Sequence, residues 1–367
     1  MMLVKAVLLI LSCGGLVFAS LMAPASISGT LQISDLVVVG TANVAFSAGT
    51  YSGTILVGEV LKGKAVTGSA IPISWIEPPN AMRIRVPGRA EKPLQLTGIF
   101  FLQAASGPFQ ILTMTSGAYS FAQLFLPTIP GASRGPIAAA VSSQAKTALD
   151  RIALEVLASF EAGLPSRYDL AGVYKDTRSP VLLAAFKSFK MSTDKELAAL
   201  GHAGSIATGD ASSIEAIHQN AKTLSTARRW DSVLFEIQQF RDPANVNAIT
   251  ALENIVSDQS ALLPLRQAAG ISLGAIHARH SLPYLAALLT EPSLTLRTAA
   301  VGGLALFAND VAIGASSPGA RPSPYRGDQT IAHSAWDERI VGRDGSYTSF
   351  WQAWWLTHRA ELTASAY

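Results

Sequence analysis

The sequence has almost no cysteine and little charge. Cys13 is the only cysteine among 367 residues, which excludes an intramolecular disulfide framework and a metal site built from several thiolates. Charged residues make up 14% of the chain and hydrophobic residues 49%, whereas a typical soluble domain has roughly 25% charged residues. Intrinsic disorder requires the opposite bias, so the composition predicts a folded chain with much buried surface.

Basic runs and several catalytic motifs are absent too. The formal net charge is +3, and no five consecutive residues are all Lys or Arg; a nucleic-acid-binding face needs a denser basic cluster. The chain also lacks H-E-x-x-H, the phosphate-binding P-loop and G-x-G-x-x-G, which carry zinc-peptidase, nucleotide and dinucleotide chemistry. We therefore expect neither a nucleic-acid partner nor a cofactor.

The N-terminus has the pattern of an export signal. Lys5 makes a short positive region, and the apolar stretch 6–18 has the length of a signal-peptide core but is too short to cross a bilayer. Small residues predict cleavage after Ala19, so that residues 1–19 form a signal peptide and the mature protein is periplasmic or secreted, with no membrane span. One alternative is a lipoprotein anchored at Cys13, because residues 11–14 resemble a lipoprotein box, and another is an uncleaved N-terminal anchor.

Residues 27–126 are predicted to form short strands. Five runs rich in β-branched and apolar residues are separated by turn residues, and they lie at 35–40, 54–61, 70–76, 98–102 and 109–114. The continuous apolar run from Leu36 to Val39 indicates a strand that is covered on both faces. Runs of this length and spacing are typical of a small barrel or sandwich.

Three of these segments resemble the netrin-like, tissue-inhibitor-like branch of the OB barrels. The matching residues are Ser34–Gly40 (SDLVVVG), Glu59–Gly63 (EVLKG) and Gly98–Leu102 (GIFFL). The resemblance covers about a hundred residues and implies a small barrel with an inhibitor or sensor role. The inhibitors in that family use a cysteine at the mature N-terminus to block a catalytic metal. This chain lacks that cysteine, so the inhibitory mechanism does not carry over.

Helices follow the Pro- and Gly-rich stretch 128–136. One long amphipathic helix is predicted over 136–160, with the proline in its first turn. Thr193 and Glu196 have the spacing of a capping box, which predicts the start of a helix that stops at Gly201. Ser179 and Pro180 predict the start of another helix, and further helices joined by short turns continue through the rest of the region.

An internal repeat is clearest between residues 263 and 310. Four residues recur thirty-one positions later: Leu265, Arg266, Ala269 and Leu273 correspond to Leu296, Arg297, Ala300 and Leu304. Between the two copies, Leu282 and Pro283 predict the start of another helix. Self-similarity at this period is the pattern of a stacked solenoid, in which neighbouring helix pairs cover one another's apolar faces.

The segment from Asp242 to Asp310 resembles HEAT-type repeats. The match rests on the Arg-x-Ala-Ala helices at 266–269 and 297–300 and on the Leu-Pro helix start between them. The resemblance implies an α-solenoid, in which alanine pairs let neighbouring helices approach closely and the arginine lies near the preceding turn. The helices before Asp242 are assigned to the same solenoid, over 136–310, by continuity. It also implies an extended curved surface suited to a protein or peptide partner.

The C-terminal part is predicted to be a loop followed by an aromatic helix. Residues 311–346 include a stretch rich in Gly, Pro and Ser, which favours a loop. From 347 to 363, aromatic residues recur at helical spacing and include Trp351, Trp354 and Trp355. We predict a helix that caps the end of the solenoid. The alternative is that these tryptophans are exposed and contact a partner, because Trp dominates interface hot spots.

These features predict an α+β multidomain protein, with an OB-like barrel at 27–126 and an α-solenoid at 136–310. The leading hypothesis is a non-catalytic exported scaffold that binds a protein or peptide through the solenoid surface. The alternative is an inhibitor or sensor acting through the barrel. A metal-dependent enzyme is the third hypothesis, with His277 and His280 as ligands and Asp310 or Glu291 as a third. Histidines at a helix C-terminus are also favoured by the helix dipole alone.

Overall fold

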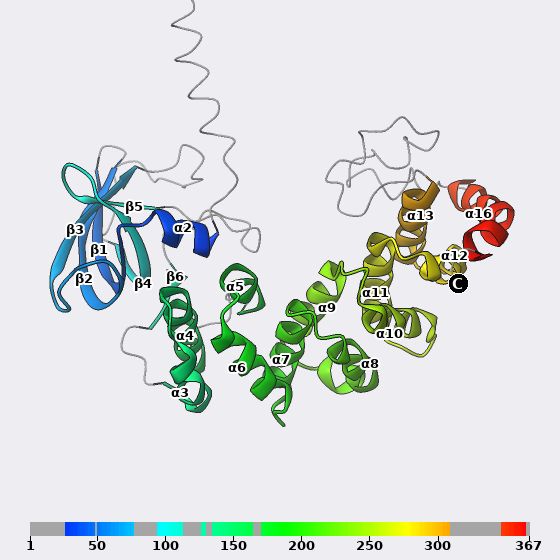
Figure 1. Ribbon diagram of the computed structural model, residues 1–367, viewed down its shortest axis with the longest axis horizontal. Coiled ribbons are helices and arrows are strands. Elements are labelled where there is room, and N and C mark those ends of the chain that lie inside the picture. The colour runs from blue at the N-terminus through cyan, green and yellow to red at the C-terminus, as the bar shows by residue number, and fades with distance from the viewer. Residues whose placement is uncertain are drawn as a thin grey trace, which may run out of the picture. The chain divides into compact units, whose positions relative to one another are not determined.

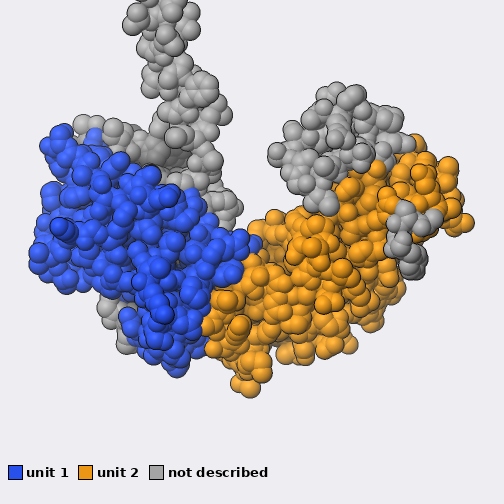
Figure 2. Space-filling view, in the orientation of Figure 1, with its two compact units in different colours: residues 1–182 blue, residues 183–367 orange. Residues whose placement is uncertain are grey.

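The computed structural model divides into two compact units, residues 1–182 and 183–367 (Figures 1 and 2). It describes residues 26–47, 50–76, 94–112, 126–129, 134–163, 170–308 and 346–364. The predicted signal peptide, Cys13, Asp310 and residues 311–345 of the predicted loop lie outside these ranges. Strands fall in the first unit and helices occur in both, so the protein is α+β.

The first unit contains a closed five-stranded barrel. Its strands are β1 (Leu36–Ser47), β2 (Thr50–Lys62), β3 (Ala70–Ile76), β4 (Leu94–Gln103) and β5 (Phe109–Ile111). β1 pairs antiparallel with both β2 and β4, and β5 pairs with β4 and, in parallel, with β3, so the sheet closes on itself. A short strand, β6 (Leu126–Pro127), adds to β4. The predicted small barrel is confirmed.

Burial along the strands follows the sequence pattern. Each residue from Leu36 to Val39 is at most 3% exposed, and each from Ile99 to Leu102 is fully buried, as expected for strands covered on both faces. At Gly53 of β2, an added Cβ would lie 2.0 Å from the Asn43 carbonyl oxygen of β1. A glycine is therefore needed where these two strands cross closely.

The three segments of the OB-like resemblance meet at one end of the barrel. The Asp35 amide donates to the Leu102 carbonyl at 2.9 Å, and the Asp35 carboxylate accepts from the Ala104 amide at 2.8 Å. The Lys62 ammonium donates to the carbonyl oxygens of Leu31 and Ser34 at 2.7 and 2.6 Å. These bonds tie β1, β2 and β4 together.

Lys62 also satisfies the end of a helix that the sequence pattern did not predict. α2 (Ile27–Ile33) precedes β1, in a region expected to begin with strands. The Ser26 hydroxyl caps it by accepting from the Gly29 amide at 3.1 Å. A two-turn helix gives little periodic signal, and its stability comes from the cap and from the tertiary bond to Lys62.

The long helix predicted over 136–160 is wrong. The chain instead forms α3 (Pro136–Val141), the 3-10 turn η1 (Ser142–Gln144) and α4 (Ala148–Glu161). Thr147 and Asp150 form a reciprocal capping box that starts α4. The Glu161 carboxylate accepts from the amides of Ile137 and Ala138 at 3.0 and 2.7 Å, which folds the end of α4 onto the start of α3. The capping box therefore starts a new helix after Thr147, although the apolar stripe continues through this point.

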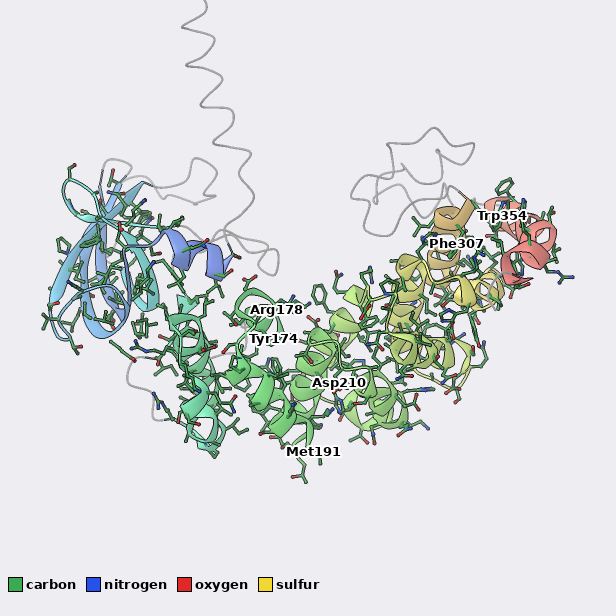
Figure 3. All side chains as sticks on the ribbon, in the orientation of Figure 1. Tyr174, Arg178, Met191, Asp210, Phe307 and Trp354 are labelled. Atoms are coloured by element: carbon green, nitrogen blue, oxygen red, sulfur yellow. The ribbon has the colours of Figure 1, made fainter. Side chains whose placement is uncertain are left out.

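Two further helices complete this stretch of the chain. α5 (Leu170–Thr177) contacts α2 and α4, and α6 (Pro180–Lys190) begins at the predicted proline. At the end of α5, the exposed Arg178 adopts a left-handed φ of 51°. Its guanidinium lies 5.6 Å from the centre of the Tyr174 ring (Figure 3), which provides a cation–π contact at the helix end.

The second unit consists of helices that contact alternate neighbours. They are α7 (Lys195–Ala207), α8 (Ser212–Leu224), α9 (Trp230–Gln239), α10 (Val246–Ser257), α11 (Leu263–Ile276), α12 (Leu282–Leu288), α13 (Leu294–Ala308) and α16 (Ser346–Ala364). α7, α9, α11 and α13 contact one another in sequence and form a first helix row. α8, α10 and α12 form a second helix row (Figure 1).

The predicted stop at Gly201 is also wrong, because α7 continues to Ala207. Asp194, and not Thr193, caps the helix, since its carboxylate accepts from the Glu196 amide at 2.8 Å. A Cβ at Gly201 would lie 2.2 Å from the Lys190 amide nitrogen. Gly201 therefore permits close packing against the end of α6, and does not terminate the helix.

Small residues also set the spacing of α11 and α13. A Cβ at Gly274 would lie 2.5 Å from the Ala299 carbonyl oxygen, and one at Gly303 would lie 2.9 Å from the Gly274 Cα. The resemblance to HEAT repeats implied close approach through alanine pairs. In the structure two glycines share that role with Ala299.

Enlarging a buried alanine in this row should destabilise it. Ala300 is fully buried whereas Thr295, on the same helix, is exposed. Ala300→Leu is expected to cost roughly 1–3 kcal/mol through overpacking, and Thr295→Leu less than about 0.5 kcal/mol. Urea unfolding followed by circular dichroism measures both values, and equal midpoints would contradict the close packing of α13.

Candidate functional site

A charged cavity lies within the first unit, beside the barrel. Its volume is about 140 Å3, and it is lined by residues from β2, from the segment preceding α3, from η1 and its flank, and from α4. The lining residues are Glu59, Arg134, Ser142, Ala145, Arg151, Leu154 and Glu155. Four of these seven side chains are ionisable, an unusual density for a chain so poor in charge.

Glu59 and Arg151 neutralise each other. The Arg151 Nη2 lies 2.6 Å from the Glu59 Oε1, and it also donates to the Val60 carbonyl oxygen at 2.8 Å. Both side chains are more than a third exposed, so the pair adds little stability in high-dielectric surroundings. Its effect is geometric, because it anchors α4 against β2 and fixes one wall of the cavity.

Glu155 and Arg134 have no such partner in the part of the chain that the structure describes. Among the described residues neither side chain makes a hydrogen bond or an ion pair. The pKa of Glu155 is raised to about 7, chiefly by burial and also by the nearby charge of Glu59, while Arg134 opposes the rise. A carboxyl group with a pKa near neutrality, on the wall of a cavity, can bind or release a proton at physiological pH.

This pKa shift predicts a pH dependence of stability. Because the folded-state pKa of Glu155 lies above its unfolded value, its contribution to stability is fully present below about pH 4.5 and is lost as pH rises through about 7. Glu155→Gln should therefore melt close to the wild type at pH 5 and about 3 °C higher at pH 8, the shift that roughly 1 kcal/mol produces in a domain of this size. Differential scanning fluorimetry at both pH values tests this.

The exposed Glu361 on α16 provides a matched control for that measurement. Glu361→Gln should leave the difference between the two pH values unchanged. A Glu155→Gln profile parallel to that of the wild type would show that Glu155 does not titrate as described.

The repeat positions are structural. The six apolar side chains are each at most 1% exposed: Leu265, Ala269, Leu273, Leu296, Ala300 and Leu304. They lie in a single hydrophobic core that extends through the second unit. None of them is available to a ligand.

The two repeated arginines bind turns between helices. The buried Arg266 donates to the Val256 carbonyl at 3.2 Å and forms an ion pair with Glu291 at 2.6 Å. The half-buried Arg297 donates to the carbonyl oxygens of Glu291 and Pro292 at 2.6 and 2.9 Å. Both arginines therefore contact the turn between α12 and α13, and Arg266 also holds the end of α10.

The C-terminal tryptophans belong largely to the core. Trp351 is fully buried and Trp354 is 8% exposed, whereas Trp355 is half-buried. α16 contacts α12 and α13, and Trp354 lies at the same end of the unit as Phe307 of α13 (Figure 3). A partner contact through Trp351 or Trp354 is wrong, because a surface anchor must be accessible.

The structure does not assemble the metal site considered for His277 and His280. The His277 ring packs on Phe307 with centroids 4.0 Å apart, and the His280 Nε2 lies 3.6 Å from the Glu253 Oε1. Glu291 is engaged by Arg266, and Asp310 lies outside the described residues. Within the described ranges, no group of three or more His, Cys, Asp or Glu residues is placed to hold a metal ion.

One sequence motif with catalytic associations has a structural role. Gly270–Gly274 reads G-I-S-L-G, the pattern of a hydrolase nucleophile turn. Here it lies inside α11, where Ser272 is fully buried and its hydroxyl donates to the Phe240 carbonyl at 2.9 Å. A nucleophile must be exposed at a strand-to-helix turn, so this serine is a packing residue that joins α11 to the end of α9.

Sequence reasoning missed the cavity. Arg151 and Glu155 are four residues apart on a helix, a spacing typical of a solvated surface ion pair. The structure turns Arg151 toward Glu59, ninety-two positions earlier in the chain, and this leaves Glu155 without an ion pair among the described residues. Nothing in the local sequence pattern indicates that Arg151 pairs with Glu59 and not with Glu155.

Comparison with protein-family models, with curated proteins and with solved structures found no match. Among the described residues, no helix combines the length and the hydropathy that crossing a membrane requires.

Proposed function

We propose that the protein is a non-catalytic, exported scaffold that binds a protein or peptide through an α-solenoid of HEAT-like helix pairs. The arrangement of contacts supports this proposal. Helices two apart in the sequence touch along both helix rows, as expected where each pair stacks on the next. A stack of this kind offers an extended surface to a long partner.

The observation that carries the proposal is a repeated exposed leucine. The first residues of α11 and α13, Leu263 and Leu294, are 49% and 38% exposed. Each begins a Leu-x-Leu-Arg segment in which the second leucine is buried and the arginine binds backbone carbonyls. Because the two helices are in contact, these leucines are spaced by roughly 10 Å. This spacing suits side chains three residues apart on one face of a polyproline II peptide, which repeats every three residues over roughly 9 Å.

The C-terminal helix fits the same proposal. Terminal units of a solenoid must cover the apolar end of the stack. α16 places Trp351 and Trp354 in the core beside α12 and α13. The signal-like segment 1–19 is the basis for proposing export.

The test is peptide binding measured by fluorescence polarisation. The probes are proline-rich peptides in the polyproline II conformation that carry two leucines three residues apart, on one face and roughly 9 Å from each other, and the same peptides with serine in place of leucine. The leucine peptides should bind, and Leu263→Asp and Leu294→Asp should each weaken binding at least tenfold. The control is Leu56→Asp, on a barrel residue that is 54% exposed.

The same experiment separates the alternative, an inhibitor or sensor that acts through the barrel. If Leu56→Asp weakens binding and the two helical variants do not, the partner binds the barrel. If the serine peptides bind as well as the leucine peptides, the exposed leucines do not recognise the partner and the scaffold proposal fails in this form.

A further inference from the structure

The cavity beside the barrel is lined by one charged side chain of each sign that has no ion-pair partner among the described residues. Glu59 and Arg151 pair with each other, and Arg151 is further held by backbone carbonyl oxygens. Arg134 and Glu155 line the same cavity without an ion pair or hydrogen bond to any described residue. Two opposite charges that share a cavity without touching leave room for a molecule that bridges them.

The remaining walls are small or apolar. Leu154 is buried, and Ala145 is half-buried. The Ser142 hydroxyl donates to the Ala139 carbonyl at 2.8 Å, so its oxygen can still accept a hydrogen bond. A ligand that fits these walls has a short apolar body, a positively charged donor at one end and a negatively charged acceptor at the other.

We infer that this cavity binds a small zwitterion, a molecule of about the size of valine that carries one ammonium and one carboxylate group. The carboxylate pairs with the Arg134 guanidinium, and the ammonium group pairs with the Glu155 carboxylate. The volume of about 140 Å3 sets the size limit, since an engineered cavity of about 150 Å3 accommodates one benzene molecule.

Singly charged ligands fit this charge distribution less well. An anion near Arg134 also meets the carboxylates of Glu59 and Glu155, and a cation near Glu155 makes no use of Arg134. A zwitterion satisfies both groups while the net charge of the cavity stays the same. The inference does not depend on the helical surface proposed as a scaffold, because all the residues named here belong to the first unit.

Binding of such a ligand is coupled to a proton. The charged groups around Glu155 are Glu59 from β2, Arg134 ahead of α3 and Arg151 on its own helix. The ammonium group binds the ionised form of Glu155, whose pKa is about 7 without ligand. The ionised fraction rises from about 3% at pH 5.5 to about 90% at pH 8, so affinity should increase at least tenfold over this range.

The experiment is isothermal titration calorimetry of the full chain with L-valine, isobutylamine and isobutyrate at pH 5.5 and 8. L-valine is expected to bind at pH 8 at least tenfold more tightly than either singly charged analogue, and at least tenfold more tightly than at pH 5.5. Glu155→Gln and Arg134→Gln should each weaken valine binding at least tenfold, with Glu155→Gln also removing the pH dependence. Lys64→Gln, at an exposed position after β2, should bind as the wild type does.

Each variant must keep a cooperative thermal transition, so that lost binding is not lost folding. Arg134 is exposed and Glu155→Gln preserves side-chain shape, so both variants should fold. The inference is overturned if valine gives no binding heat at millimolar concentration, if isobutyrate or isobutylamine binds equally well, or if both folded variants bind valine as the wild type does. Failure of the peptide-binding experiment would leave this result unaffected.

Discussion

Replacing Trp351 with alanine is expected to destabilise the second unit by about 3–5 kcal/mol, the cost of removing a large aromatic side chain from a packed core. Trp351 is fully buried, and the centre of its ring lies 5.5 Å from the ring centre of Trp354 and 5.2 Å from that of Phe350. It belongs to the core that extends through the second unit. Loss of this side chain should therefore destabilise the whole second unit and not α16 alone.

Urea unfolding followed by far-ultraviolet circular dichroism measures this effect. Trp355→Ala is the matched control, because it removes the same side chain from a half-buried position on the same helix and should cost clearly less. If the two variants unfold at the same urea concentration, α16 does not close the core as described. Tryptophan fluorescence is unsuitable as the signal, since both variants remove a fluorophore.

Replacing Arg266 with alanine is expected to cost about 3–5 kcal/mol, because it leaves the Glu291 carboxylate without its partner in a nearly buried position. The two side chains are only 6% and 12% exposed. Hydrogen bonds from Arg266 and Gln259 hold the pKa of Glu291 below its usual value. The ionised pair therefore stabilises the fold above the unfolded pKa of Glu291, and this contribution is lost as pH falls through the depressed folded value.

Two comparisons sharpen this test. Arg297→Ala removes the repeat-related arginine, which is half-buried and donates to carbonyl oxygens without an ion pair among the described residues, so it should cost less. The double variant Arg266→Met with Glu291→Leu removes both charges and should recover most of the lost stability. A loss of stability below about 1 kcal/mol for Arg266→Ala would contradict the prediction, because it would mean that water replaces the guanidinium group as the partner of Glu291.

Helix starts show which local features the sequence identifies well. Pro136 and Pro180 begin helices as predicted, since a proline without an amide hydrogen suits the first turn. Glycine was a less reliable indicator of where a helix ends. Gly201 suggested an end to α7, but it permits a close contact with the Lys190 backbone. Both roles require the absence of a Cβ, and only the tertiary neighbour distinguishes them.

The capping box at Thr147 illustrates a second limit. An apolar stripe continues from α3 into α4, so periodicity alone indicates one helix. The reciprocal bonds between Thr147 and Asp150, and the Glu161 carboxylate on the amides that start α3, favour two helices instead. Local hydrogen bonds at helix ends can outweigh a periodicity that both arrangements satisfy.

The sequence by itself determined that the chain has a part made of short strands and a helical part, because alternation, apolar runs and helix-start residues act over short stretches of chain. It also determined which leucines and alanines of the repeat are buried, since their spacing fixes one face of each helix. The tertiary structure alone decided that Trp351 is core and that Arg151 pairs with Glu59, leaving Glu155 and Arg134 to face a common cavity. Those outcomes depend on groups brought together from distant parts of the chain, and local spacing carries no information about them.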